Sequence, residues 1–155
     1  MKLGKFGLIS ALSLICAVVF ASPAFAAPPA DGDCNGGRPL SAELSGEAEV
    51  PDTGALDGSG TANVRVNPGQ ECLSYDLDVE GIAPANAAHI HEAPAGSAGP
   101  VRQHLEPPTD GSSSGTVNEV SREDAKDLVK NPEEYYVNVH NADFLGGALR
   151  GQLSK

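Results

Sequence analysis

The chain has 155 residues, of which 21 are acidic and 10 basic, giving a formal net charge of −11 at pH 7. A surface this acidic repels nucleic acid and anionic lipid, so we expect no nucleic-acid partner and no membrane partner for the mature protein, whereas cations are tolerated. The length suits a single domain.

The first 26 residues are typical of a secretory signal peptide. Lys2 and Lys5 precede an apolar run over residues 8–20, and residues 24–26 form an A-x-A cleavage site. The run is too short to span a bilayer. We therefore expect residues 1–26 to be removed on export, giving a secreted or periplasmic protein. Because the two lysines are lost, 8 basic and 21 acidic residues remain, a net charge of −13.

Two cysteines, Cys34 and Cys72, follow the leader. An even pair in an exported chain most simply forms one disulfide, which would tie a flexible Pro/Gly/Asp-rich lead (residues 27–39) to a strand beginning near Cys72. Closing a loop of about 38 residues is worth about 3–4 kcal/mol in the chain-entropy model. The alternative is that both thiols bind a metal, although no histidine lies near either in the sequence.

Short alternating segments fill the predicted domain, residues 40–155. Alternation of polar and apolar side chains predicts strands over residues 40–50, 61–67, 72–80, 88–91, 101–105, 116–120, 135–140 and 148–153. Spacers rich in Gly, Pro and Ser predict loops over residues 51–60, 94–100 and 107–115, the last being the most mobile. Residues 67–70 form a turn that joins two strands into a hairpin.

One helix interrupts the strands. We expect Ser121 to cap its N-terminus, with carboxylates in the first turn. The helix should have about eight residues and end before Pro132, because the residue before a proline avoids the helical conformation. Many short strands, turn-rich spacers and one brief helix predict an all-β fold, an antiparallel Greek-key sandwich or barrel such as the immunoglobulin type.

Three of the four histidines share one face of two predicted strands. Residues two apart in a strand point the same way, so His89 and His91 lie together, opposite Ile90. In the stretch from Tyr136 to His140, the two valines share one face and the histidine lies on the other. If the two strands are close in the sheet, three imidazoles converge on its outer surface.

His104 is the fourth histidine and can join this cluster. Sites rich in imidazole and poor in oxygen favour Cu(II) or Zn(II) over Ca²⁺ or Mg²⁺, and an exported compartment points to copper. The structural alternative is a set of exposed strand histidines without a ligand. Another polar strand face, Asp76, Asp78 and Glu80, is interpreted as solvated surface, with weak calcium binding as its alternative. No hydrolase motif or phosphate-binding loop is present.

Six short motifs occur in order along the chain: L-S-G-x-x-E-V-P from Leu44, G-T-A from Gly60, A-H-I-H from Ala88, G-P-V from Gly99, Y-V-N-V-H from Tyr136 and G-G-x-x-R-G-Q-L from Gly146. Together they resemble the CHRD domain over residues 40–153. The resemblance implies an extracytoplasmic β domain and no particular activity. The chain departs from the usual pattern at Glu92, where members often have glycine, and at His104, where they often have an acidic or apolar residue.

A second resemblance concerns chemistry and is carried by H-I-H-E from His89, A-G-P from Ala98, His104, V-N-V-H-N-A-D from Val137, and Arg150. These segments are similar, in the same order, to the copper-site segments of Cu,Zn superoxide dismutase. The similarity implies a dismutase-like fold, four copper ligands (His89, His91, His104 and His140) and Arg150 as the catalytic residue that guides the anion. The zinc-binding cluster and the long electrostatic loop of that family have no counterpart, so at most a copper-only site is implied.

Three hypotheses follow for function. The one we favour is an exported, non-enzymatic protein that binds a copper ion through its histidines, in copper binding or tolerance. The second is a copper-only enzyme like superoxide dismutase. The third is a metal-free structural or protein-interaction module, which would have a protein partner instead of a metal ion.

Overall fold

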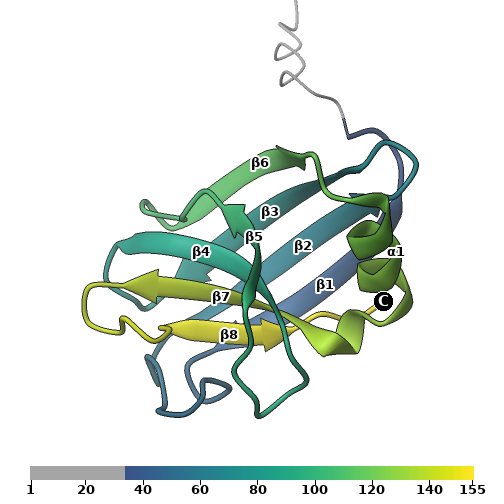
Figure 1. Ribbon diagram of the computed structural model, residues 1–155. Coiled ribbons are helices and arrows are strands. Elements are labelled where there is room, and N and C mark those ends of the chain that lie inside the picture. Colours follow the sequence, from purple (N-terminus) through teal and green to yellow (C-terminus); the bar gives the residue numbers. More distant parts are fainter. Residues whose placement is uncertain (1–33) are drawn as a thin grey trace, which may run out of the picture.

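The computed structural model describes residues 34–155, so the predicted signal peptide and the first part of the predicted lead lie outside the described residues. Figure 1 shows the order of the elements along these residues. They form eight strands, one α-helix and one 3₁₀ helix: β1 (Arg38–Ser45), β2 (Ser59–Asn67), β3 (Cys72–Glu80), β4 (Ala85–Glu92), β5 (Val101–Leu105), β6 (Ser112–Asn118), α1 (Arg122–Lys130), η1 (Pro132–Glu134), β7 (Tyr135–Asn141) and β8 (Leu149–Gln152).

All eight strands belong to one antiparallel sheet, in the order β5-β4-β7-β8-β1-β2-β3-β6. The sheet is rolled round so that its edge strands β5 and β6 face each other (Figure 1). Two hydrogen bonds cross this seam: the Glu106 N–H donates to the Tyr75 hydroxyl at 2.8 Å, and the Ser113 hydroxyl donates to the Glu106 carbonyl at 2.7 Å. The predicted all-β antiparallel fold with one short helix is confirmed.

The interior of the rolled sheet is apolar because alternate residues of each strand point inward. On β3, Leu73 and Leu77 are buried whereas Asp76 and Asp78 are exposed, as the alternation predicts. Each fully buried large aliphatic side chain contributes roughly 1.5–3 kcal/mol. Other members of the core come from every strand except β6: Leu40, Ala42, Leu44, Ala62, Val64, Val66, Ala88, Ile90, Leu105, Val137, Val139 and Leu149. Polar side chains are therefore left to the outer face of the sheet.

Helix α1 begins and ends as the sequence predicts. The Ser121 hydroxyl caps its first turn by accepting the N–H of Asp124 at 3.0 Å. Ala125 and Leu128 turn their buried side chains to the core. The helix ends at Lys130, ahead of the proline at position 132.

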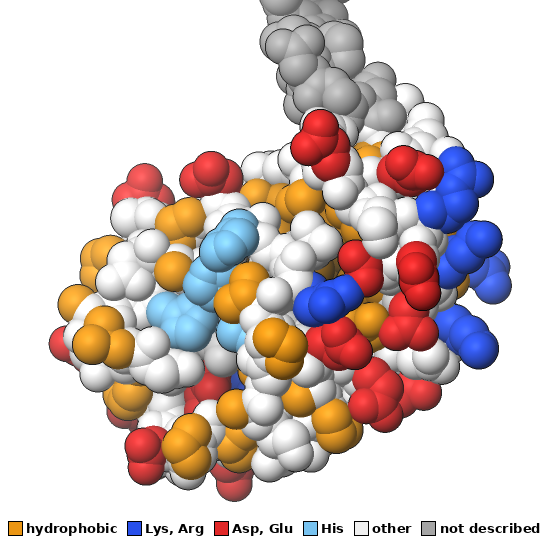
Figure 2. Space-filling view, viewed as in Figure 1, with side chains coloured by type: hydrophobic (Ala, Val, Ile, Leu, Met, Phe, Trp, Pro, Cys, Tyr) orange, Lys and Arg blue, Asp and Glu red, His pale blue; other side chains and the backbone are white. Residues whose placement is uncertain are grey.

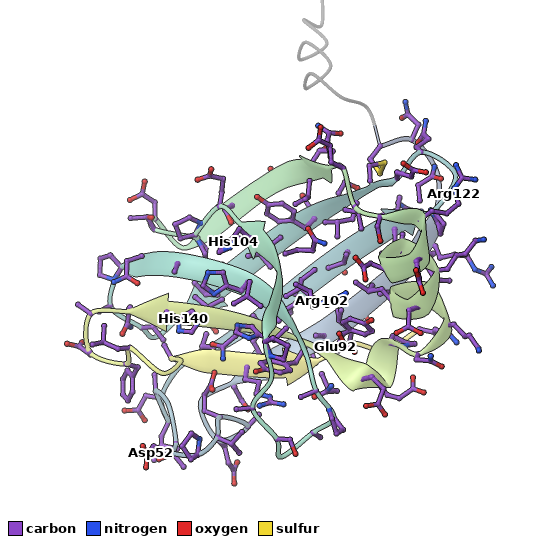
Figure 3. The ribbon with its side chains drawn as sticks, in the orientation of Figure 1. Asp52, Glu92, Arg102, His104, Arg122 and His140 are labelled. Carbon is purple, nitrogen blue, oxygen red and sulfur yellow. A yellow bond between two sulfur atoms is a disulfide. The ribbon has the colours of Figure 1, made fainter. Side chains whose placement is uncertain are left out.

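A charged bridge attaches α1 to the edge of the sheet next to the histidines. Arg102 on β5 pairs with Glu92 on β4 at 3.3 Å and with Asp124 on α1. Figure 3 labels Arg102 and Glu92, which lie together between the two elements. The helix thus supports the free edge strand β5.

The predicted disulfide is present. Cys34 and Cys72 are bonded, with their Cα atoms 5.8 Å apart. The bridge joins the first described residue to the start of β3, and both cysteines are buried. This pairing rules out the alternative in which the two thiols bind a metal.

The loop predicted over residues 107–115 is wrong in its second half, where the chain already forms β6. Serines are acceptable there because β6 is an edge strand that pairs only with β3, and its polar side chains need not fill the core. Strand β1 begins at Arg38, two residues inside the predicted lead, and ends at Ser45 instead of reaching residue 50. The 3₁₀ helix η1 was not predicted.

Three loops cover the outer face of β4, β7 and β8: the β1–β2 loop (residues 46–58), the β4–β5 loop (residues 93–100) and the β7–β8 loop (residues 142–148). In the first, the Ala55 N–H donates to the Ala148 carbonyl at 2.9 Å. In the second, the Gly99 N–H donates to the Tyr136 hydroxyl at 3.2 Å. As a result, polar side chains on this part of the outer face are partly or fully shielded from solvent.

Candidate metal centre

The pairing of β4 with β7 brings together histidines that are about fifty residues apart in the sequence. His89 lies opposite Asn138, and His140 lies opposite Ala87. Ile90 on β4 is completely buried on the inner face, so its histidine neighbours project from the outer face. The histidine side chains gather on one surface of the molecule (Figure 2). The prediction that His89, His91 and His140 converge is confirmed.

The three imidazoles are close enough to hold one ion. One ring nitrogen from each of His89, His91 and His140 lies within 4.8 Å of the other two. The shortest separation, 3.1 Å, joins Nδ1 of His89 and Nε2 of His140. Two nitrogens that each bind an ion at roughly 2.0–2.1 Å are spaced about 3–4 Å apart, so this pair already has the spacing of ligands.

Backbone carbonyls fix the tautomers of His91 and His140, and so determine which ring nitrogen has a lone pair available for a metal ion. Nδ1 of His91 lies 2.9 Å from the Gly99 carbonyl, and Nδ1 of His140 lies 3.2 Å from the Leu145 carbonyl. A carbonyl oxygen only accepts, so each Nδ1 carries the hydrogen and each Nε2 keeps its lone pair. This support from a second layer of groups is what metal-binding histidines in proteins usually have.

The ring of His91 leaves an unpaired acceptor inside the protein. Its Nε2 is buried and has no hydrogen-bond partner. A buried acceptor without a partner costs about 1–3 kcal/mol, which a bound cation would offset. The donor set and this orphaned nitrogen fit a transition-metal ion.

The imidazoles are neutral at physiological pH because their surroundings oppose protonation. Burial, followed by the neighbouring His140, His91 and His104, lowers the pKa of His89 to about 4. Burial also lowers the pKa of His91 and of His140, although the carbonyls of Gly99 and Leu145 work in the opposite direction. Neutral imidazole is the form that binds metals, so little proton release is needed on binding.

His104 lies beside the three histidines but outside their cluster. It sits on β5 directly opposite His89, with the two ring centroids 4.9 Å apart. It is exposed, whereas the other three rings are partly buried. Figure 3 labels His104 on β5 and His140 on β7. Its role as a fourth ligand remains a prediction.

Arg150 is buried beneath the site instead of facing solvent. Only 2% of the residue is exposed, and its guanidinium carbon lies 3.5 Å from the ring centroid of Tyr136. That ring in turn stacks on His91, with centroids 4.8 Å apart and planes 9° from parallel. The guanidinium also donates to the Pro94 carbonyl at 3.1 Å. In this arrangement Arg150 supports the stack that holds His91, and its predicted role as an anion guide remains a prediction.

Sequence reasoning missed two buried polar residues next to the histidines. Asn138 is 3% exposed and Glu49 is 4% exposed, and the Asn138 amide donates to Oε2 of Glu49 at 3.3 Å. Asn138 shares the strand face of His140, which could have placed it near the site. Glu49 is a fixed letter of the L-S-G-x-x-E-V-P motif, but no periodicity around it indicates burial, because a loop rather than a strand places it against β7.

Comparisons with known proteins assign the family but no close relative. A family model described as the CHRD domain matches residues 40–153. Neither the curated proteins nor the solved structures include a significant match to the chain. Among residues 34–155, no helix has the length and apolar character needed to cross a membrane.

Proposed function

This chain belongs to the CHRD domain family, and we propose that it is an exported protein that binds a transition-metal ion, copper, through His89, His91 and His140. One observation carries the proposal: three neutral imidazoles converge, and one of them keeps a buried nitrogen that has no partner within the protein. The exported location is supported by the disulfide, since such bonds persist in oxidising compartments.

The donor set favours copper over the hard cations. All three candidate ligands are nitrogen atoms, and no carboxylate or thiol of the described residues joins their cluster. Imidazole suits Cu(II) and Zn(II), while Ca²⁺ and Mg²⁺ require oxygen ligands. Copper binds more tightly than zinc to a given nitrogen site, so copper is the ion we assign.

When bound, copper would supply a redox-active cation with an open coordination position. The protein's part is to position the ligands: His91 and His140 through Nε2, and His89 through Nδ1, which faces His140. In the metal-free protein the Nδ1–H of His89 donates to Nε2 of His140 at 3.1 Å, so metal binding would shift the hydrogen of His89 to its Nε2. His104 lies exposed beside His89, outside the set of three ligands. Such a site suits copper binding or tolerance.

The two other hypotheses draw less support. A copper-only dismutase would use Arg150 as its catalytic residue, but this guanidinium is buried under Tyr136. No specific observation favours the enzyme. In a metal-free interaction module, nothing would compensate for the buried, unpaired Nε2 of His91.

The proposal is tested by calorimetric titration of the metal-free full chain with Cu(II). We expect one ion per chain in the wild type, and a loss of at least about 100-fold in affinity in His89→Ala/His91→Ala, because removing even a supporting partner costs 10–100-fold. His104→Gln is the matched control, since it removes an exposed neighbouring imidazole. We expect it to change the affinity by less than about tenfold.

Equal affinity in the wild type and the double variant would refute copper binding at this site and leave the interaction module. A larger loss in His104→Gln than in the double variant would move the site to β5. If the copper-loaded protein removes superoxide faster than free copper does, the enzyme hypothesis is restored.

A further inference from the structure

A buried acid lies next to the metal site and is not used by it. Glu49 and Asn138 are almost inaccessible to solvent, and each keeps one oxygen, Oε1 and Oδ1 respectively, without a hydrogen-bond partner. Both oxygens lie against Gly147, where an added Cβ would overlap each of them. The two orphaned acceptors therefore approach the same point from different elements.

Only the protonated form of Glu49 can give both unpaired oxygens, its own Oε1 and Oδ1 of Asn138, a hydrogen bond. A carboxylate is acceptor-only, so an ionised Glu49 leaves both oxygens unpaired, at about 1–3 kcal/mol each. A carboxylic acid carries one hydrogen, which Oε1 can donate to Oδ1 of Asn138. The Asn138 amide already donates to Oε2 of Glu49 at 3.3 Å. The acid and the amide then form a closed pair with two hydrogen bonds.

The groups around Glu49 allow the acid form at neutral pH. Burial raises the pKa of Glu49 to about 7, and it outweighs the opposing effects of the Asn138 amide, the Arg150 charge on β8 and the N–H of Val50. His89, opposite Asn138 in the sheet, is neutral at this pH and adds no further charge.

Contacts link this pair to the histidine ligands. Gly147, at which both oxygens occupy the space that a Cβ would need, belongs to the β7–β8 loop. Its N–H donates to the Phe144 carbonyl at 3.2 Å. The same loop carries Leu145, whose carbonyl lies 3.2 Å from Nδ1 of His140. The acid thus lies at the base of the loop that orients one of the three rings.

We propose that Glu49 is a positioning residue of the metal site: as a neutral acid paired with Asn138, it holds the β7–β8 loop so that Leu145 keeps the His140 ring in its binding orientation. This inference rests on the proposed metal-binding function. It assigns no contact between Glu49 and the ion. Glu49 acts through its hydrogen bonds with Asn138 and not through a negative charge. Glu49→Gln, which keeps these hydrogen bonds, and Glu49→Ala, which removes them, should therefore behave differently.

The test compares Glu49→Gln and Glu49→Ala with the control Glu47→Ala, an exposed glutamate in the same loop. Gln keeps the pair, because its amide donates to Asn138 and accepts from it, whereas Ala removes the pair. We expect Cu(II) affinity to fall about 10–100-fold in Glu49→Ala, as for other supporting residues of metal sites, and to stay within about threefold in the other two variants.

A second readout needs no metal. In the metal-free full chain, amide hydrogen exchange over residues 142–148 should be at least about tenfold faster in Glu49→Ala than in the wild type, and unchanged in Glu49→Gln and Glu47→Ala. If Glu49→Ala does not fold, a comparison of the wild type with Glu49→Gln at rising pH tests the same role, because the wild type loses the hydrogen of its acid and the glutamine does not. The loop exchange of the wild type, corrected for the intrinsic effect of pH, should accelerate above pH 7, while that of Glu49→Gln should not.

The outcomes separate the two proposals. Equal loop exchange in Glu49→Ala and the wild type, or a parallel pH response in the wild type and Glu49→Gln, overturns the positioning role. An equal loss of affinity in Glu49→Gln and Glu49→Ala also overturns it, since the residue would then act through charge. Absence of Cu(II) binding by the wild type overturns the proposed function alone, because the exchange measurements still decide the role of Glu49.

Discussion

The outer faces of β3 and β7 are built from the same alternation of side chains but have opposite environments. On β3, Asp76 and Asp78 are exposed beside the polar residues of β2 and β6. On β7, Tyr136 and Asn138 occupy the equivalent outward positions and are buried, with His140 only partly exposed. Both strands bury their other face in the core.

The difference arises from the loops. Within residues 34–155, no loop closes over the outer side of β3 at Asp76 and Asp78, so these carboxylates remain solvated. The β1–β2, β4–β5 and β7–β8 loops cover the outer side of β7 and exclude water from its polar groups. Loops thereby convert an ordinary strand face into a site with neutral histidines, an orphaned acceptor and a buried acid.

The largest expected effect contrasts two arginines on the two faces. Arg150→Met removes a desolvated cation–π contact with Tyr136, worth about 2 kcal/mol, and leaves the Pro94 carbonyl without its donor at about 1–3 kcal/mol, so it should cost about 3–5 kcal/mol of unfolding free energy. Arg65→Met, on the exposed face of β2, should change it by no more than about 0.5 kcal/mol. Chemical denaturation measures both, and similar losses would show that the two faces do not differ as described.

The next largest effect is a pH dependence of the unfolding free energy that arises on the loop-covered outer side of β4, β7 and β8. Burial gives Glu49 a folded-state pKa of about 7 against its ordinary value of 4.5, so its contribution to stability is complete below pH 4.5 and is lost as the pH rises to 7. Such a shift corresponds to about 3 kcal/mol.

The histidines oppose this trend, because their lowered pKa values make the fold lose stability as the pH falls below 6.5. Only the difference between the wild type and Glu49→Gln therefore isolates Glu49. We expect it to change by about 3 kcal/mol between pH 4 and pH 8 in denaturation experiments. A difference that is constant over this range would mean that Glu49 is not held as an acid.

Metal binding through the histidines of β4 and β7 should stabilise the folded protein as a whole. Zn(II) also suits imidazole ligands and can occupy the same site as Cu(II). At a free Zn(II) concentration 100 times the Kd, the wild type should gain about 2.7 kcal/mol, because the ion binds only the folded state. His89→Ala/His91→Ala should gain nothing at the same concentration. Thermal unfolding with and without Zn(II) checks this, and a gain of equal size in the double variant would place the ion on the exposed carboxylates instead.

The smallest effect compares two asparagines. Asn138→Ala deprives buried Glu49 of its amide donor and should cost about 2 kcal/mol, the penalty of an unsatisfied buried group. Asn63→Ala, on the exposed face of β2, should cost no more than about 0.5 kcal/mol. If urea denaturation gives the two variants the same stability, Asn138 is solvated and the loops do not seal its face.

Local pattern was sufficient to predict much of the fold. Strict alternation marks β3 and the inward valines of β7, and a serine cap with a following proline marks both ends of α1. Prediction failed where composition and structure disagree. The serines of β6 have a loop-like composition, yet pairing with β3 makes them a strand.

The candidate site was predictable only in part, for a physical reason. Alternation places His89 and His91 on one face, but it does not say that β4 pairs with β7, and the convergence depended on that pairing. The burial of Glu49 and Arg150 comes from loops that return from distant segments. Such contacts leave no periodic signal in the sequence.

The central claim is that one ion is held by three imidazoles of β4 and β7, and pulsed electron paramagnetic resonance of the Cu(II)-loaded full chain tests it most directly. The modulation from the remote ring nitrogens reports how many imidazoles bind the ion. We predict three for the wild type and two for His140→Gln, with His89 and His91 retained. The same imidazole signal in both proteins, or no imidazole signal in the wild type, would contradict the account.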